Sequence, residues 1–96
     1  MNPYIQTILT EMCSRVGADY ESIDFSSPDW YLQYTWTTAE EKEFSAWLFN
    51  YLMDNKEARA NLYGGRVFNK WTVSGAVQSF IFSYGWKVDN GKTETR

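Results

Sequence analysis

Four carboxylates in the first half of the chain are the side chains best suited to acid–base chemistry. They are Asp19, Glu21, Asp24 and Asp29. Paired carboxylates act as general acid and base when an apolar pocket raises the pKa of one of them, and this connecting segment offers no evident apolar pocket. A hard cation could use the same oxygens, but the Asp-x-Asp-x-Asp-Gly core of a calcium loop is absent. We therefore predict a solvated acidic surface, with no catalytic residue and no metal site.

The nucleophiles and bases that most enzymes use are missing or poorly placed. The 96-residue chain has no histidine, which excludes Ser-His and Cys-His nucleophiles and imidazole metal ligands. The one cysteine, Cys13, falls among apolar positions of an expected helix, where a buried structural thiol is favoured over a reactive one. Gly64-Gly65 follows an expected helix, whereas a phosphate-cradling loop precedes one. The sequence predicts a protein that is not an enzyme and has no cofactor.

Basic and aromatic residues alternate in the second half of the chain. The bases are Lys56, Arg59, Arg66, Lys70 and Lys87, and the rings are Tyr63, Phe68, Trp71 and Trp86. This mixture suits phosphate contacts and base stacking, with Arg59, Arg66 and Lys70 as the expected basic surface. The isoelectric point of about 4.8 argues against binding bulk duplex, so a nucleic-acid-binding accessory protein is the alternative function.

Helix caps and apolar periodicity predict an all-α fold, a small single-domain bundle of three main helices plus short helical turns. Asn2-Pro3 begins the first helix and Gly17 ends it. Two overlapping capping boxes at Thr37-Thr38-Ala39-Glu40-Glu41 begin a second helix over about residues 38–54. A short helix from Lys56 to Tyr63 is then predicted, capped by Asn55 and ended by Gly64-Gly65. Thr72 is the predicted cap of a last helix. Gly85 is expected to close that helix in a Schellman motif, with Trp86 as its apolar contact.

Residues 30–36 are ambiguous. Ser27-Pro28-Asp29 is a helix-start signal, but Trp30 to Trp36 also alternates with the period of a strand, for which residues 66–70 are the only plausible partner. We favour a helical turn over residues 28–33 followed by an extended Tyr34–Trp36. An aromatic cage for a methylated ammonium could also be drawn from the rings of Trp30, Tyr31, Tyr34 and Trp36.

Domain limits and compartment follow from composition. Residues 1–88 are expected to form one domain, and the polar residues 89–96 a disordered tail. No secretory signal and no apolar run long enough for a membrane span occur, so we expect a cytoplasmic protein that does not contact a membrane. The net charge of −3 is uneven: residues 1–50 carry −6 and residues 51–96 carry +3. Opposed halves that partly cancel are favoured over two separate charged faces.

The eighteen aromatic residues, counted from six Phe, five Trp and seven Tyr, are too many to bury fully in a domain of this size. The helix over residues 38–54 is apolar on two sides, so it is either central or offers one side to a partner. The residues that fall off the inward stripes are the candidate partner interface, with Gly75 allowing close approach: Phe49, Met53, Trp71, Phe82 and, less regularly placed, Trp36. The partner is a foreign protein or, in a homodimer, a second copy.

One pattern spans much of the chain. Its segments are Tyr34-Thr35-Trp36-Thr37, Glu40-Glu41, Phe44, Trp47-Leu48, Tyr51-Leu52, Asn55-Lys56-Glu57-Ala58-Arg59 and Tyr84-Gly85-Trp86-Lys87. Over residues 34–87 this pattern resembles small uncharacterised helical proteins encoded by bacteriophages. The resemblance implies a context in which small acidic proteins bind and inhibit a host enzyme or defence complex, and it assigns no functional residue. We expect a protein-binding module that acts by steric blocking.

Overall fold

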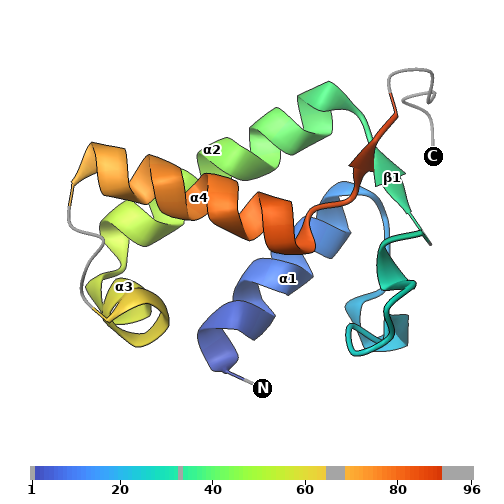
Figure 1. The fold of residues 1–96 in the computed structure, drawn as a ribbon, viewed down its shortest axis with the longest axis horizontal. Coiled ribbons are helices and arrows are strands. Elements are labelled where there is room, and N and C mark those ends of the chain that lie inside the picture. Colours follow the sequence, from blue (N-terminus) through green and yellow to red (C-terminus); the bar gives the residue numbers. More distant parts are fainter. Residues whose placement is uncertain (1, 33, 65–68, 90–96) are drawn as a thin grey trace.

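The computed structural model describes residues 2–32, 34–64 and 69–89, and they are mostly helical (Figure 1). The helices are α1 (Pro3–Arg15), α2 (Thr38–Asp54), α3 (Lys56–Tyr63) and α4 (Lys70–Tyr84), with 3-10 turns η1 (Tyr20–Ser22) and η2 (Trp30–Leu32) and strands β1 (Thr35–Trp36) and β2 (Lys87–Val88). This composition agrees with the predicted all-α class. The described part of the chain has four α-helices, which correspond to the three longer helices and the short Lys56–Tyr63 helix expected from the sequence, together with a strand pair that was not expected.

The two ends of α1 form as the sequence predicts. The Asn2 side chain accepts from the N–H groups of Tyr4 and Ile5, and Pro3 occupies the first turn, where no hydrogen bond is lost. Gly17 has a φ of 70°. The N–H of Ala18 bonds to the Cys13 carbonyl at 2.9 Å, which is the long bond of a Schellman motif.

Local caps also set the limits of α2 and α3. The Glu40 N–H donates to the Thr37 hydroxyl at 3.1 Å and the Thr37 N–H donates to the Glu40 carboxylate at 2.7 Å, so the first of the two predicted capping boxes is present. Asn55 caps α3 by accepting from the Ala58 N–H at 3.0 Å, and Gly64 ends α3 with a φ of 63°. The predicted bounds of both helices are confirmed.

The predicted start of α4 is wrong, and its end at Gly85 is confirmed without the expected Schellman geometry. The helix begins three residues earlier than expected, because Asn69 is the cap: its side chain accepts from the N–H groups of Trp71 and Thr72 at 2.9 and 3.1 Å. Thr72 instead completes the capping box by accepting from the Asn69 N–H at 3.1 Å. Gly85 has φ −68° and ψ 150°, which is not the left-handed conformation that a Schellman motif requires.

The extended segment before α2 pairs with a different partner from the one expected. The helical turn at Trp30–Leu32 and the extension of Thr35–Trp36 are confirmed. However, β1 pairs in parallel with β2, aligning Thr35 with Lys87 and Trp36 with Val88. Of the expected partner, residues 66–68 lie outside the described residues, and Asn69 and Lys70 begin α4.

Asp89, the first residue of the predicted polar tail, is described. The Asp89 N–H bonds to the Trp36 carbonyl at 2.9 Å, so Asp89 extends the paired segment. The rest of that predicted tail, residues 90–96, lies outside the described residues.

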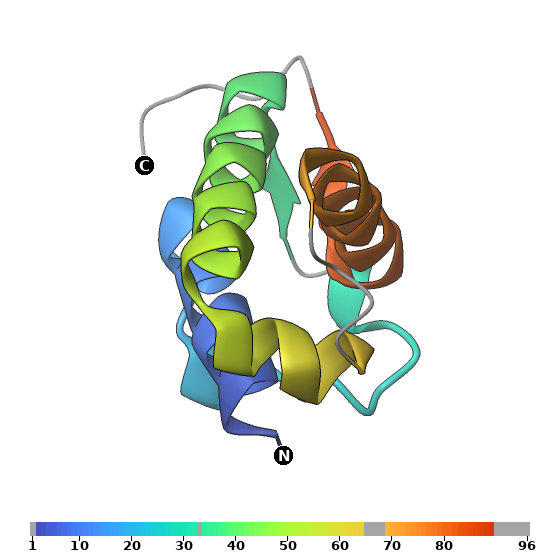
Figure 2. The same ribbon diagram turned by 90° about the vertical axis from the view of Figure 1, so that its left-hand side faces the viewer.

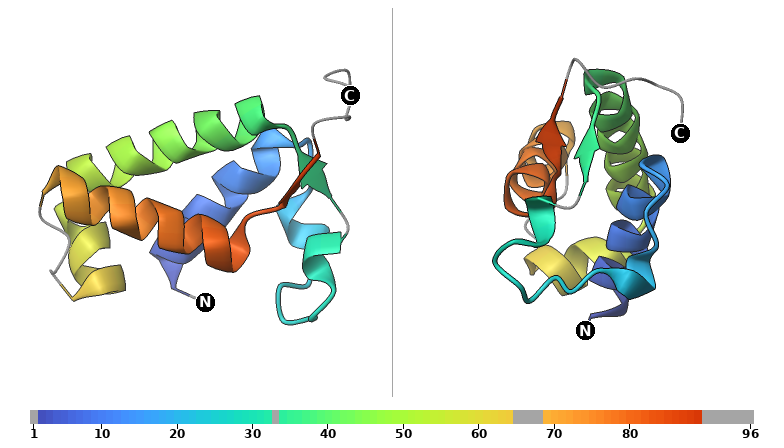
Figure 3. Two further views of the ribbon diagram at one scale, coloured as in Figure 1. Left: turned by 45° about the horizontal axis from the view of Figure 1, so that its top comes forward. Right: turned by 90° about the vertical axis from the view of Figure 1, so that its right-hand side faces the viewer.

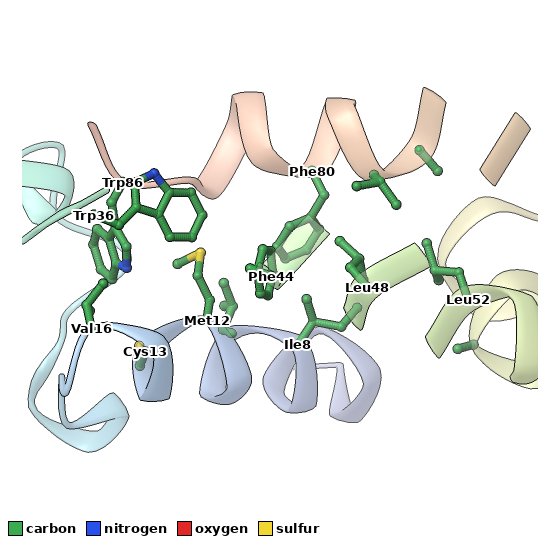
Figure 4. Close-up of a cluster of buried hydrophobic side chains, with 14 of the residues drawn as sticks. Ile8, Met12, Cys13, Val16, Trp36, Phe44, Leu48, Leu52, Phe80 and Trp86 are labelled. Carbon is green, nitrogen blue, oxygen red and sulfur yellow. The ribbon is translucent and has the colours of Figure 1, made fainter. Parts of the chain in front are cut away.

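The core lies where α1, α2 and α4 meet. α2 and α4 run antiparallel side by side, and α1 packs against α2 (Figures 2 and 3). α3 follows α2 directly and contacts both α1 and α2. Most of the buried side chains come from the four helices; Trp36 in β1 and Trp86, just before β2, add two buried rings (Figure 4). The largest of those that are fully buried are Trp36, Phe44, Ile8, Leu9, Met12, Leu48 and Leu52.

Candidate functional site

Two aromatic side chains on α4 are almost completely exposed. Trp71 is 88% exposed and Phe82 is 93% exposed. Eleven residues separate them, so at 100° per residue they lie within about 20° of each other on the same side of the helix. Gly75 and Gln78 are exposed between them, as the helical spacing predicts. We call Trp71, Gly75, Gln78 and Phe82 the α4 stripe.

The seam between α2 and α4 beside the α4 stripe is hollowed. One hollow of about 250 Å³ is lined by Ser45, Ala46, Phe49, Ser74, Val77 and Gln78. A second, of about 390 Å³, is lined by Glu41, Ser45, Gln78, Ile81 and Phe82. Because the two hollows share Ser45 and Gln78, they form one groove along the seam. The sequence did not indicate that Glu41, Ser45 and Ile81 line it, since their positions become adjacent only when the two helices pack.

The predicted interface residues separate into surface and core. Met53 is 37% exposed, and Phe49 is half-buried, packed against the core while lining the groove. Trp36 is fully buried, so its assignment to the interface is wrong. Its ring centroid lies 5.7 Å from that of Phe44, and it packs near Trp86 at the strand end of the core (Figure 4).

The four carboxylates predicted to form an acidic surface are all exposed. Asp19 caps η1 by accepting from the Glu21 N–H at 3.1 Å. Asp24 accepts from the Ser26 hydroxyl and N–H, and these hydrogen bonds lower the pKa of the Asp24 carboxyl. A lowered pKa is the opposite of what a general acid at neutral pH needs. Among the described residues, no group of three or more His, Cys, Asp or Glu could hold a metal ion.

The predicted basic surface is only partly available for contacts. The Arg59 guanidinium donates to the carbonyls of Leu52 and Met53 at 2.6 and 2.7 Å, so Arg59 caps the carboxyl end of α2. Lys70 is exposed at the start of α4, and Arg66 lies outside the described residues. No geometry in the described part of the chain favours nucleic-acid binding over protein binding.

Two rings of the predicted aromatic cage pack against another ring of this chain. Trp86 is 3% exposed, and its ring centroid lies 5.0 Å from Trp30, 5.5 Å from Tyr34 and 6.5 Å from Phe25. Phe25, Trp30 and Tyr34 therefore contact a ring of this chain, while the side chain of Tyr31 lies outside the described part. The sequence did not indicate this role of Trp86, because residues 25–34 and residue 86 are far apart in sequence.

A smaller apolar hollow lies between α1, α3 and α4. It measures about 210 Å³ and is lined by Ile5, Leu62, Tyr63, Ser79, Phe80, Ser83 and Tyr84. Burial raises the pKa of the Tyr63 phenol, and the neighbouring Tyr84 contributes to the same shift. The hollow was not predicted, because it requires contacts between helices that the periodicity of single helices does not indicate.

The chain was compared with protein-family models, with curated proteins and with solved structures, and none of them matches. Within the described ranges, no helix combines the length and the apolar character needed to cross a membrane.

Proposed function

We propose that this chain is a small acidic protein-binding module whose contact surface is the α4 stripe together with the α2–α4 groove. The observation that carries the proposal is the exposure of Trp71 and Phe82, at 88% and 93%, on one side of one helix. A tryptophan ring held in water contributes little to the stability of the folded domain, whereas in an interface Trp is among the residues that contribute most binding energy. Phe49 and Met53 on the adjacent helix extend the apolar surface.

The nature of the partner follows from charge and from the resemblance to phage-encoded proteins. Residues 1–50 carry a net charge of −6, which would steer the module towards a basic surface. In the context that the resemblance implies, the partner is a host or defence protein in the cytoplasm of an infected bacterium. The module would block that protein sterically, since binding alone hides the surface that it covers.

Affinity capture with matched variants tests this proposal. Tagged wild type and a Trp71→Asp/Phe82→Asp variant are incubated with bacterial lysate, and bound proteins are quantified by mass spectrometry. We expect at least one protein to be enriched by the wild type and by a Thr10→Asp control on α1, and to be lost from the double variant. Equal capture by all three proteins, or no enrichment by any of them, would contradict the proposed contact surface.

A further inference from the structure

Antiparallel pairing of two copies would place the exposed rings of the α4 stripe against each other. Trp71 and Phe82 lie at its two ends, and the midpoint between them falls between Ala76 and Val77, beside Gly75 and Gln78. A second α4 stripe turned end for end about that midpoint brings Trp71 of one copy opposite Phe82 of the other, twice. We propose that a second copy of this chain occupies the α4 stripe, in an antiparallel two-fold dimer. The inference takes from the proposed function only that this face contacts protein.

The centre of the stripe is open enough for two helices to approach closely. Gly75 is exposed, and a Cβ placed on it would meet nothing within 4 Å. A glycine at a crossing point removes the side chain that would hold two helix axes apart. The neighbouring positions Ser74 and Gln78 are also exposed, so no described part of this chain covers the crossing point.

A hollow lies where the second copy's tryptophan would arrive. End-for-end pairing places Trp71 of the second copy beside Phe82, next to the hollow of about 390 Å³ lined by Glu41, Ser45 and Ile81 among others. An indole can bury its ring against Phe82 and Ile81 there. The Glu41 carboxylate and the Ser45 hydroxyl are acceptors for its N–H, which a buried tryptophan normally pairs. The opposite charges of Lys70, beside Trp71, and Glu41, beside Phe82, also face each other in this arrangement.

The exposed rings alone supply about half of the area that a dimer needs. Large aromatic side chains bury roughly 150–250 Å² each. The almost fully exposed Trp71 and Phe82 of two copies make four such rings, which together would remove roughly 700 Å² from water. Specific interfaces begin at about 1,200 Å² in total. The remaining area would come from Gln78, Gly75, Met53 and the walls of the groove on both copies. A dimer and a foreign partner would compete for this face, so the dimer would be the form present when the foreign partner is absent.

Sedimentation equilibrium with variants at Gly75 tests the dimer. The wild type should shift from 11.3 kDa towards twice that mass as its concentration rises through the micromolar range. Gly75→Gln adds bulk at the crossing point, and its Cβ would meet nothing within 4 Å in its own chain, so it should weaken association at least tenfold without lowering the melting temperature of the monomer at low protein concentration. Ala60→Gln, at an exposed position on α3, is the control and should associate like the wild type.

Cross-linking then tests the antiparallel geometry. In the proposed dimer Gln78 lies beside the two-fold axis, so a Gln78→Cys variant should form a disulfide-linked dimer on mild oxidation. Cys13 is 1% exposed and should not cross-link. A wild type that stays at 11.3 kDa up to millimolar concentration would overturn the dimer. Loss of a captured protein from the Trp71→Asp/Phe82→Asp variant would in that case still support a foreign partner. Dimers that persist in Gly75→Gln, or no cross-link at Gln78→Cys, would overturn this interface.

Discussion

Cys13 shows how burial at a single residue controls its chemistry. Its thiol is 1% exposed on the inner side of α1, and burial raises its pKa to about 11 from an ordinary value of 9.0. The thiolate is the nucleophilic form, so a raised pKa makes the thiol unreactive at neutral pH. The sequence predicted this structural role because Cys13 shares the helical stripe of Leu9, Met12 and Val16.

The raised pKa of Cys13 predicts a loss of stability in alkali. Between pH 9 and 11 the folded state holds a proton that the unfolded state releases, so the free energy of unfolding falls as pH rises. A pKa difference of two units corresponds to roughly 2–3 kcal/mol. Urea titrations from pH 8 to 11 should show a steeper decline for the wild type than for Cys13→Ala. Parallel pH profiles would contradict the prediction.

Adding one methyl group at either of two glycines of the α4 region is expected to change the stability of the fold in opposite directions. A Cβ on Gly85 would lie 2.5 Å from the Ile81 carbonyl oxygen and 3.1 Å from Trp36 Cζ2, whereas one on Gly75 would meet nothing within 4 Å. We expect Gly85→Ala to destabilise the fold by about 1–3 kcal/mol through this overlap. Gly75→Ala should stabilise it by about 0.5–1 kcal/mol, because alanine is the better helix former. Thermal and urea denaturation at low protein concentration measure both; a stable Gly85→Ala would contradict the packing of Trp36 against α4.

At the scale of elements, local signals predicted what depends on neighbours in sequence. The limits of α2 and α3 were predictable because Thr37, Asn55 and Gly64 act on backbone groups within four residues. The start of α4 was misplaced because Asn69 and Thr72 are both capping residues, and the structure uses both in one box. The pairing of β1 with β2 joins two-residue strands about fifty residues apart, which is too short a pattern for periodicity to detect.

The capping box of α2 predicts a defined cost for losing its hydroxyl. Thr37→Ala removes the hydroxyl that accepts from the Glu40 N–H, and Thr37 itself is only 6% exposed. Loss of an N-cap costs typically about 1 kcal/mol, so the urea midpoint should fall. Thr10→Ala is the control: its hydroxyl bonds to the Gln6 carbonyl within an exposed turn of α1, where alanine is the better helix former. An equal effect of the two substitutions would contradict the capping role.

At the scale of the whole molecule, the division between surface and core depends on which helices meet. The outward side of α4 was predicted from its spacing, and Trp71 and Phe82 confirm it. Trp36 was misjudged because only the approach of β2 and the end of α4 encloses it. The seam groove likewise exists only after α2 and α4 pack side by side. Candidate contact residues on one helix were therefore predictable, while their neighbours on the other helix were not.

The burial of each aromatic side chain predicts how much its substitution lowers the free energy of unfolding. Trp71→Asp and Phe82→Asp remove rings that contact water, so each should change the free energy of unfolding by less than about 0.5 kcal/mol. Trp36→Ala empties a fully buried site and should cost about 3–5 kcal/mol. Phe49→Ala, at a half-buried ring, should fall between them. Urea denaturation at submicromolar concentration, where association does not contribute, measures all four. A loss of several kcal/mol in Phe82→Asp would mean that α4 packs with its stripe inward, and both proposals for this face would then fail.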